Sequence, residues 1–120
     1  MKTIILMATI LLTFSAVNAQ ISEVKQESGY YYIYDSGGNH LGTVDSKRGE
    51  YKLLGYNSKY VVIEMSGYAY VHDSSGNTGC YTCGSIELKG GTEIVGVNES
   101  EILVKISGNT YKYGFDGRIK

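Results

Sequence analysis

The sequence contains no proline and no tryptophan, and only two cysteines, two histidines and two phenylalanines among its 120 residues. No window places apolar residues at helical spacing over three turns, which argues against a helical domain. No basic cluster is longer than Lys47-Arg48, and the formal net charge is only −1. Nucleic acid is therefore not expected as a partner.

Motifs that carry catalysis or hold cofactors are also missing. There is no Gly-x-Ser-x-Gly elbow and no phosphate-binding glycine loop leading into a helix. The turns at Asp35 and Asp73 supply one carboxylate each, too few for a calcium loop, and hairpin turn chemistry explains them better. We expect no catalytic residue, no metal site and no cofactor.

The N-terminus has the pattern of an export signal. Lys2 precedes an apolar stretch over 4–14, and small residues lead to Ala19. A membrane anchor would need about 20 apolar residues, so cleavage after residue 19 is expected. The Asn18-Ala19 end before Gln20 resembles secretory signals of Bacteroidota. The sequence thus predicts a signal peptide over 1–19, a single exported domain over 20–120, in the periplasm or outside the cell, and no membrane span after cleavage.

Tyrosine and glycine dominate the rest of the chain. All twelve tyrosines and all sixteen glycines lie beyond residue 19. Tyrosine suits half-buried strands, and glycine suits the tight turns between them. Short runs bounded by Gly, Ser, Asn and Asp recur throughout, which predicts an all-β domain of about ten short antiparallel strands.

The domain also shows an internal repeat. Residues 51–77 match 92–118 at an offset of 41, as Gly55 matches Gly96. An earlier copy matches at an offset of 38, as Gly29 matches Gly67. Each unit of about 40 residues is read as four strands, in the middle copy 60–65, 68–72, a distorted 77–88, and 92–97.

Two-residue turns set the register of the central hairpins. With Ser66-Gly67 as the turn, Ile63 faces Tyr70 on one side of the sheet. This side is expected to be core, as is the side that holds Ile102, Val104 and Ile106 with Asn109, Tyr111 and Tyr113. The opposite side is expected to be half-solvated; it carries Val62, Glu64, Ala69 and Val71, and then Leu103, Lys105, Thr110 and Lys112.

The first copy departs from this pattern. Charged residues replace the aliphatic ones that should face its tyrosines: Glu27, Lys25 and Glu23 oppose Tyr30, Tyr32 and Tyr34. A charged edge strand that blocks aggregation and a binding surface both explain these residues. His72 occupies the column in which the other copies have Tyr34 and Tyr113, so it is interpreted as filling an aromatic position.

The segments 28–38 and 66–76 resemble hairpins of WG-type and propeller-type β-repeats, in which an aromatic strand runs into an Asp-x-x-Gly turn. The Trp-Gly pair typical of the first family is absent. The resemblance implies binding or scaffolding and no catalytic residue. Two and a half copies cannot close a propeller, so a monomer is expected to curl into a roll or small barrel. The alternative is a partial propeller completed by homo-oligomerisation.

Cys80 and Cys83 lie where the middle copy is longer than the first. An even cysteine count in an exported chain predicts a disulfide. A reduced or metal-linked pair and thiol redox activity remain alternatives, although a thioredoxin-like site would require a helix N-terminus.

These observations predict an exported, non-enzymatic binding or interaction module whose partner is an unknown protein or a glycan. A lectin-like oligomer and a thiol-redox protein using Cys80 and Cys83 are the alternatives. Tyrosine can stack on a ligand and hydrogen-bond to it. The candidate ligand-binding residues are Tyr30, Tyr32, Tyr34, Tyr56 and Tyr81.

Overall fold

A computed structural model describes residues 20–120; the predicted signal peptide over 1–19 lies outside the described residues. Ten strands and no helix make up the described chain, and all strand pairs are antiparallel, which confirms the predicted all-β class. With no helix there, nothing in 20–120 could cross a membrane as a helical span. The strands are β1 (Glu23–Glu27), β2 (Tyr30–Tyr34), β3 (His40–Asp45), β4 (Lys52–Tyr56), β5 (Val61–Met65), β6 (Tyr68–His72), β7 (Ser85–Glu87), β8 (Thr92–Val97), β9 (Ile102–Ile106) and β10 (Asn109–Tyr113).

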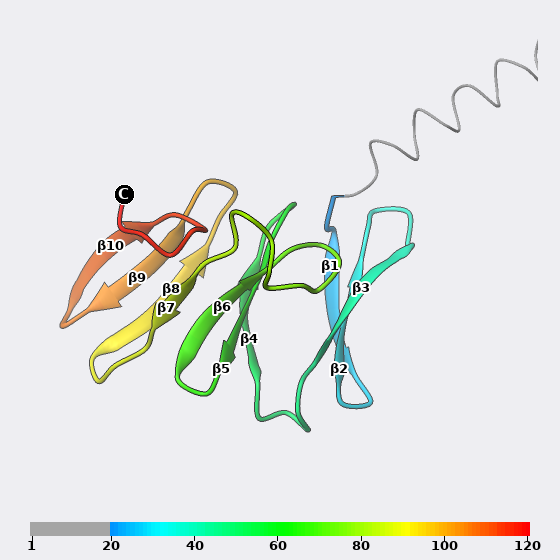
Figure 1. Ribbon diagram of the computed structural model, residues 1–120, viewed down its shortest axis with the longest axis horizontal. Coiled ribbons are helices and arrows are strands. Elements are labelled where there is room, and N and C mark those ends of the chain that lie inside the picture. The colour runs from blue at the N-terminus through cyan, green and yellow to red at the C-terminus, as the bar shows by residue number, and fades with distance from the viewer. Residues whose placement is uncertain (1–19) are drawn as a thin grey trace, which may run out of the picture.

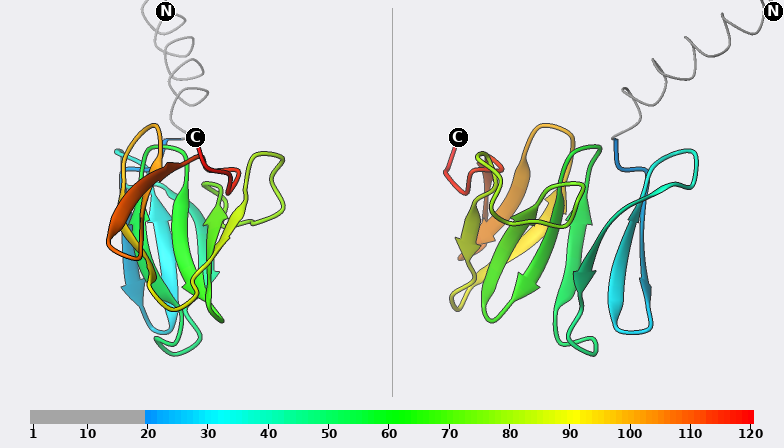
Figure 2. Two further views of the ribbon diagram at one scale, coloured as in Figure 1. Left: turned by 90° about the vertical axis from the view of Figure 1, so that its left-hand side faces the viewer. Right: turned by 45° about the vertical axis from the view of Figure 1, so that its right-hand side comes forward.

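The strands form three separate sheets, β1–β3, β4–β7 and β8–β10, each with its strands in chain order. Figures 1 and 2 show the sheets side by side, with the first sheet at one end and the third at the other. The chain passes from the last strand of one sheet to the first strand of the next. No sheet of the described chain closes on itself, so the predicted roll or small barrel is not seen.

Three of the hairpin turns have the expected two-residue form. Ser66 and Gly67 have φ values of 53° and 85°, and the Ser28-Gly29 and Ser107-Gly108 turns match them closely. Two successive positive φ values bend the chain in the sense that matches the twist of the flanking strands. The predicted register is confirmed, with Ile63 opposite Tyr70 and Val104 opposite Tyr111.

Side chains are buried in two layers, one on each side of the middle sheet. The first layer joins Tyr31 and Ile33 of β2 to Val61 and Ile63 of β5. The second layer joins the other side of the middle sheet to the third sheet; its fully buried members are Val62, Ala69, Val71, Ile102 and Val104. Each outer sheet thus contributes one buried side, and the middle sheet contributes two.

This stacking corrects two predictions of burial. The side of the middle sheet that holds Val62 and Val71 is not half-solvated, because the third sheet covers it. In the third sheet, Asn109 and Tyr111 are exposed although their side was predicted to be core. Both errors have one cause. The alternation of polar and apolar residues along a strand does not show which side another sheet covers, and the covering sheet determines burial.

The third strand of the middle copy is also shorter than predicted. Only Ser85–Glu87 pairs with β6, and residues 77–84 form a loop. This loop contains the disulfide, and it ends where the Gly84 N–H donates to the Phe115 carbonyl at 2.8 Å. The extra residues of the middle copy therefore leave the sheet and contact the C-terminal turn.

Glycines allow the turns to approach neighbouring strands closely. A Cβ on Gly76 would lie 2.5 Å from the Thr43 carbonyl oxygen, and one on Gly117 would lie 2.5 Å from the Ser85 carbonyl oxygen. Both glycines also have positive φ. The turn after β6 packs on β3 and the turn after β10 packs on β7, so the same contact links successive sheets.

Candidate functional site

The first-sheet outer face is the side of β1–β3 that points away from the other two sheets. Register places three tyrosines of β2 there, opposite alternate residues of β1 and β3. The face consists of Glu23, Lys25, Glu27, Tyr30, Tyr32, Tyr34, His40, Thr43 and Asp45. The predicted pairing of these tyrosines with charged residues is confirmed.

The aromatic side chains of this face form one connected row. Tyr30 and Tyr32 have ring centroids 6.2 Å apart, and the His40 ring lies 5.6 Å from Tyr32 and 5.8 Å from Tyr34. Neighbouring rings are tilted by 53–56°, with centroids inside the 4.5–7 Å range at which aromatic pairs attract each other. The row is therefore ridged, and its rings share no common plane.

Exposure differs along the row. Tyr30 is 43% exposed, whereas Tyr32 and Tyr34 are half-buried against their neighbours. The Lys25 ammonium lies 5.9 Å from the centre of the Tyr34 ring and 3.8 Å from a Glu23 carboxylate oxygen. Tyr30 is thus the most accessible aromatic contact, and the other end of the row is covered in part by a lysine.

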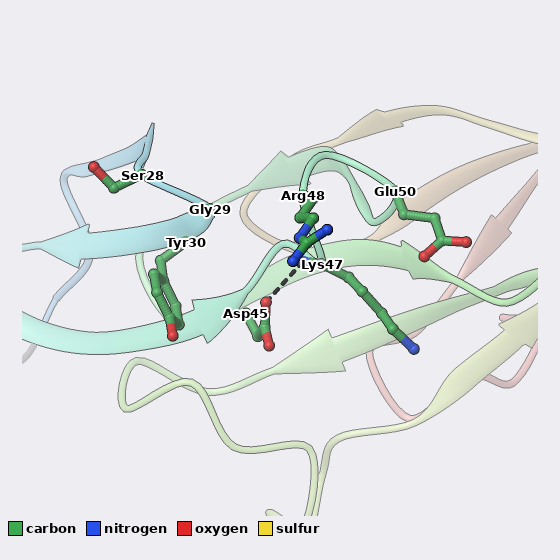
Figure 3. A pocket seen from close by; sticks show the side chains of 7 residues that line it. All are labelled: Ser28, Gly29, Tyr30, Asp45, Lys47, Arg48 and Glu50. Carbon is green, nitrogen blue, oxygen red and sulfur yellow. Dashed lines mark hydrogen bonds between the residues drawn. The ribbon is translucent and has the colours of Figure 1, made fainter.

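A hollow of about 510 Å³ opens beside Tyr30. Two turns border it, the β1–β2 turn and the β3–β4 turn, and Figure 3 shows Tyr30 and Asp45 pointing to the same side. Its lining residues are Ser28, Gly29, Tyr30, Asp45, Lys47, Arg48 and Glu50. Donors and acceptors of both charges therefore surround one exposed aromatic ring.

The β3–β4 turn that shapes this hollow has an unusual backbone. Lys47, Arg48 and Gly49 have successive φ values of 49°, 57° and 84°. The left-handed region costs about 1–2 kcal/mol for each residue with a Cβ. The Asp45 carboxylate accepts a 2.7 Å hydrogen bond from the Lys47 N–H, and the Tyr51 N–H donates to the Ser46 carbonyl at 3.0 Å. These bonds hold the basic pair at the rim of the hollow.

The remaining predicted tyrosines lie elsewhere. Tyr56 ends β4 and is 37% exposed, and Tyr81 is fully exposed at the tip of the loop after β6. The structure brings together Tyr30, Tyr32 and Tyr34, and neither Tyr56 nor Tyr81 belongs to their face. The five predicted residues therefore do not form one site.

Cys80 and Cys83 are joined by a disulfide, as predicted. The Cys83 N–H also donates to the Cys80 carbonyl at 3.1 Å, which closes the loop as a turn. The Thr82 hydroxyl lies 2.6 Å from the Tyr60 hydroxyl, and the Tyr60 ring stacks on Phe115 at 4.7 Å. These contacts attach the loop to the middle and third sheets.

The Asp35 and Asp73 carboxylates organise turns. Asp35 accepts 2.9 Å hydrogen bonds from the N–H groups of Gly37 and Asn39, and these bonds, the one from Asn39 above all, lower the pKa of Asp35. Asp73 accepts bonds from Ser75 and Asn77 in the same pattern. Within residues 20–120 no group of three or more His, Cys, Asp or Glu side chains is placed to hold a metal ion.

Two features of the site were not predicted. His40 joins the aromatic row because a bulge in the β2–β3 pairing places it opposite Tyr34, and bulges leave no clear signal in sequence. The hollow arises where two turns distant in sequence meet. The run Asp45-Ser46-Lys47-Arg48-Gly49 does carry a turn signal, which could have identified the β3–β4 turn.

Comparison with known protein families, with curated proteins and with solved structures finds no match to this chain.

Proposed function

We propose that this protein is an exported, non-enzymatic binding module made of tandem β-repeats, and that the first-sheet outer face is its binding surface. The observation that carries the proposal is the row Tyr30, Tyr32 and Tyr34 on a side that no other sheet of residues 20–120 covers. The equivalent side of the middle sheet holds Val61 and Ile63, both fully buried. The side that packs against a neighbouring sheet in the middle sheet is therefore exposed in the first sheet, at the end of the stack.

The order of the strands supports a propeller-like repeat over a roll. The chain twice leaves the last strand of one sheet and enters the first strand of the next, and the sheets pack face to face. Propeller blades are connected in this way. We propose that the three sheets are successive blades of an arc.

The placement of both histidines supports a role other than catalysis. His72 is 2% exposed and its Nδ1 lies 3.2 Å from the Tyr70 carbonyl oxygen. His40 Nε2 lies 2.8 Å from the Thr43 hydroxyl and its ring packs on tyrosines. Each ring thus has a packing role that explains its presence.

A glycan is a second candidate ligand, and the hollow beside Tyr30 favours it. Sugars are bound by an aromatic face together with hydrogen-bonding groups, and here Asp45, Arg48 and Glu50 surround an exposed tyrosine. The tilt between neighbouring rings limits this mode to a single ring at Tyr30.

The test is binding of the purified protein to a glycan array and to an immobilised random peptide library. We expect a bound probe whose signal falls at least about tenfold in Tyr30→Ala/Tyr32→Ala, since losing a buried aromatic contact costs about 2 kcal/mol or more. Tyr81→Ala is the matched control, because it removes an exposed tyrosine outside the face. A probe signal that survives in Tyr30→Ala/Tyr32→Ala, or one lost only in Tyr81→Ala, would contradict the proposal.

A further inference from the structure

We propose that the partner of the first-sheet outer face is the third sheet of a second copy of this chain, docked head to tail. This inference rests on the proposed function, because it names the occupant of the same surface. The third-sheet outer face is the side of β8–β10 that points away from the middle sheet. It includes Glu93, Leu103, Lys105, Thr110 and Lys112.

The two contacts between sheets inside the chain use equivalent sides. The first joins the Tyr31 and Ile33 side of one sheet to the Val61 and Ile63 side of the next. The second joins the equivalents 38 residues on, Ala69 and Val71, to the equivalents 41 residues on, Ile102 and Val104. We call the side of Tyr31 and Ile33, with its equivalents, the rear side of a sheet, and the side of Val61 and Ile63, with its equivalents, the front side. Both contacts therefore join the rear side of one sheet to the front side of the next.

This order leaves one side of each kind uncovered. The first-sheet outer face is a front side, since Glu23, Lys25 and Glu27 occupy the positions of Val61, Ile63 and Met65. The third-sheet outer face is a rear side, with Leu103 and Lys112 at the positions of Val62 and Val71. A second copy can thus continue the stack with the same pairing of sides.

The charges of the two faces are complementary. Glu23, Glu27 and Asp45 on the first-sheet outer face are all exposed, and its one lysine, Lys25, is paired with Glu23. On the third-sheet outer face Lys105 and Lys112 are exposed diagonal neighbours across β9 and β10, opposite Thr110 and Leu103 respectively. Glu93 of β8 is exposed opposite Lys105, so two lysines against one carboxylate leave this face with a net positive charge. Opposite charge steers such faces together and disfavours contact between two identical faces.

Tyrosine rings and lysines also suit each other at close range. A lysine ammonium placed over a tyrosine ring gains about 0.5–1 kcal/mol at an exposed site and more where water is excluded. Lys25 and Lys47 already make such contacts within the chain, at 5.9 Å and 5.7 Å from the Tyr34 and Tyr51 ring centres. Leu103 is half-buried and supplies an apolar contact between the two lysines.

Charged residues in place of aliphatic ones make this contact weaker than those inside the chain and sensitive to salt. The polar end faces therefore keep a chain soluble when it is not docked, as the outer faces of terminal repeats must. Because the two faces differ, the contact is heterologous and builds a ring or an open chain of copies.

The test reverses the charges of the two faces by substitution and measures the molar mass in solution by light scattering. The salt concentration is about 20 mM, where screening is weak. The wild-type mass should rise with concentration above that of one chain and fall back when salt is added. Lys105→Glu/Lys112→Glu makes both faces acidic, and Glu23→Lys/Glu27→Lys makes both basic, so each variant alone should remain a single chain. Mixed together they present opposite faces again, and the mass should rise.

Lys52→Glu/Lys89→Glu is the control, because it makes the same charge change on exposed residues of neither face. It should assemble as the wild type does, and circular dichroism should show all variants folded. A wild-type chain that stays single up to about 1 mM at low salt overturns the inference. So does a mixture that fails to gain mass. If a single chain binds a glycan or peptide probe and Tyr30→Ala/Tyr32→Ala loses it, self-docking is overturned while the proposed binding surface stands.

Discussion

Val71→Ala tests whether the middle sheet is buried on both sides. Val71 is fully buried between the middle and third sheets, together with Val62 and Ala69. The change removes two methyl groups, worth about 0.8 kcal/mol each in transfer from water. The cavity that remains adds a further penalty, so we expect the free energy of unfolding to fall by about 2–3 kcal/mol.

Urea unfolding followed by tyrosine fluorescence or circular dichroism measures this loss. A domain of this size has an m-value of about 1–1.5 kcal/mol per molar urea, so the midpoint should fall by about 1.3–3 M. Val95→Ala is the matched control, since it makes the same deletion at a residue that is 48% exposed. Its free energy of unfolding should change by no more than about 0.5 kcal/mol.

Equal effects of the two substitutions would refute the stacked arrangement. If Val71 lay on a half-solvated side, as its strand sequence suggests, its truncation would cost under about 1 kcal/mol. A small effect of Val71→Ala would therefore mean that the third sheet does not cover the middle one.

Two further predictions concern a close approach and a buried histidine. Gly84→Ala should lower the free energy of unfolding by about 1–3 kcal/mol, because its Cβ would overlap the backbone of Asp116 and Gly117 and disturb a backbone hydrogen bond. A thermal melt measures this loss. Gly90→Ala, which has open space around it, is the control and should melt as the wild type does. Burial lowers the pKa of His72 below its ordinary 6.5. As the pH falls from about 7.5 to about 5.5, the unfolded chain therefore binds a proton at His72 more readily than the folded chain does. Stability should therefore decline over that interval in urea titrations, and the decline should become shallower in His72→Gln but persist in His40→Gln; equal slopes in all three proteins would contradict this assignment.

Several features could be predicted from local sequence because their causes are local. Ser66-Gly67 places positive φ values where a two-residue hairpin needs them, and that turn alone determines the pairing of Ile63 with Tyr70. Asp35 and Asp73 cap their own turns with side-chain oxygens. The pairing of Tyr30, Tyr32 and Tyr34 with charged residues followed from the same register rule.

What tertiary structure decided was which sides of the strands face another sheet. The alternation at Val62 and Val71 looks half-solvated when read along the strand, yet both are fully buried because another sheet packs there. The separation of Tyr56 and Tyr81 from the tyrosine row, and the addition of His40 to it, likewise depended on stacking, on a bulge and on a loop leaving the sheet. Sequence by itself determined the strands, turns and register through contacts between near neighbours, whereas the burial of each side depended on contacts between residues far apart in the chain.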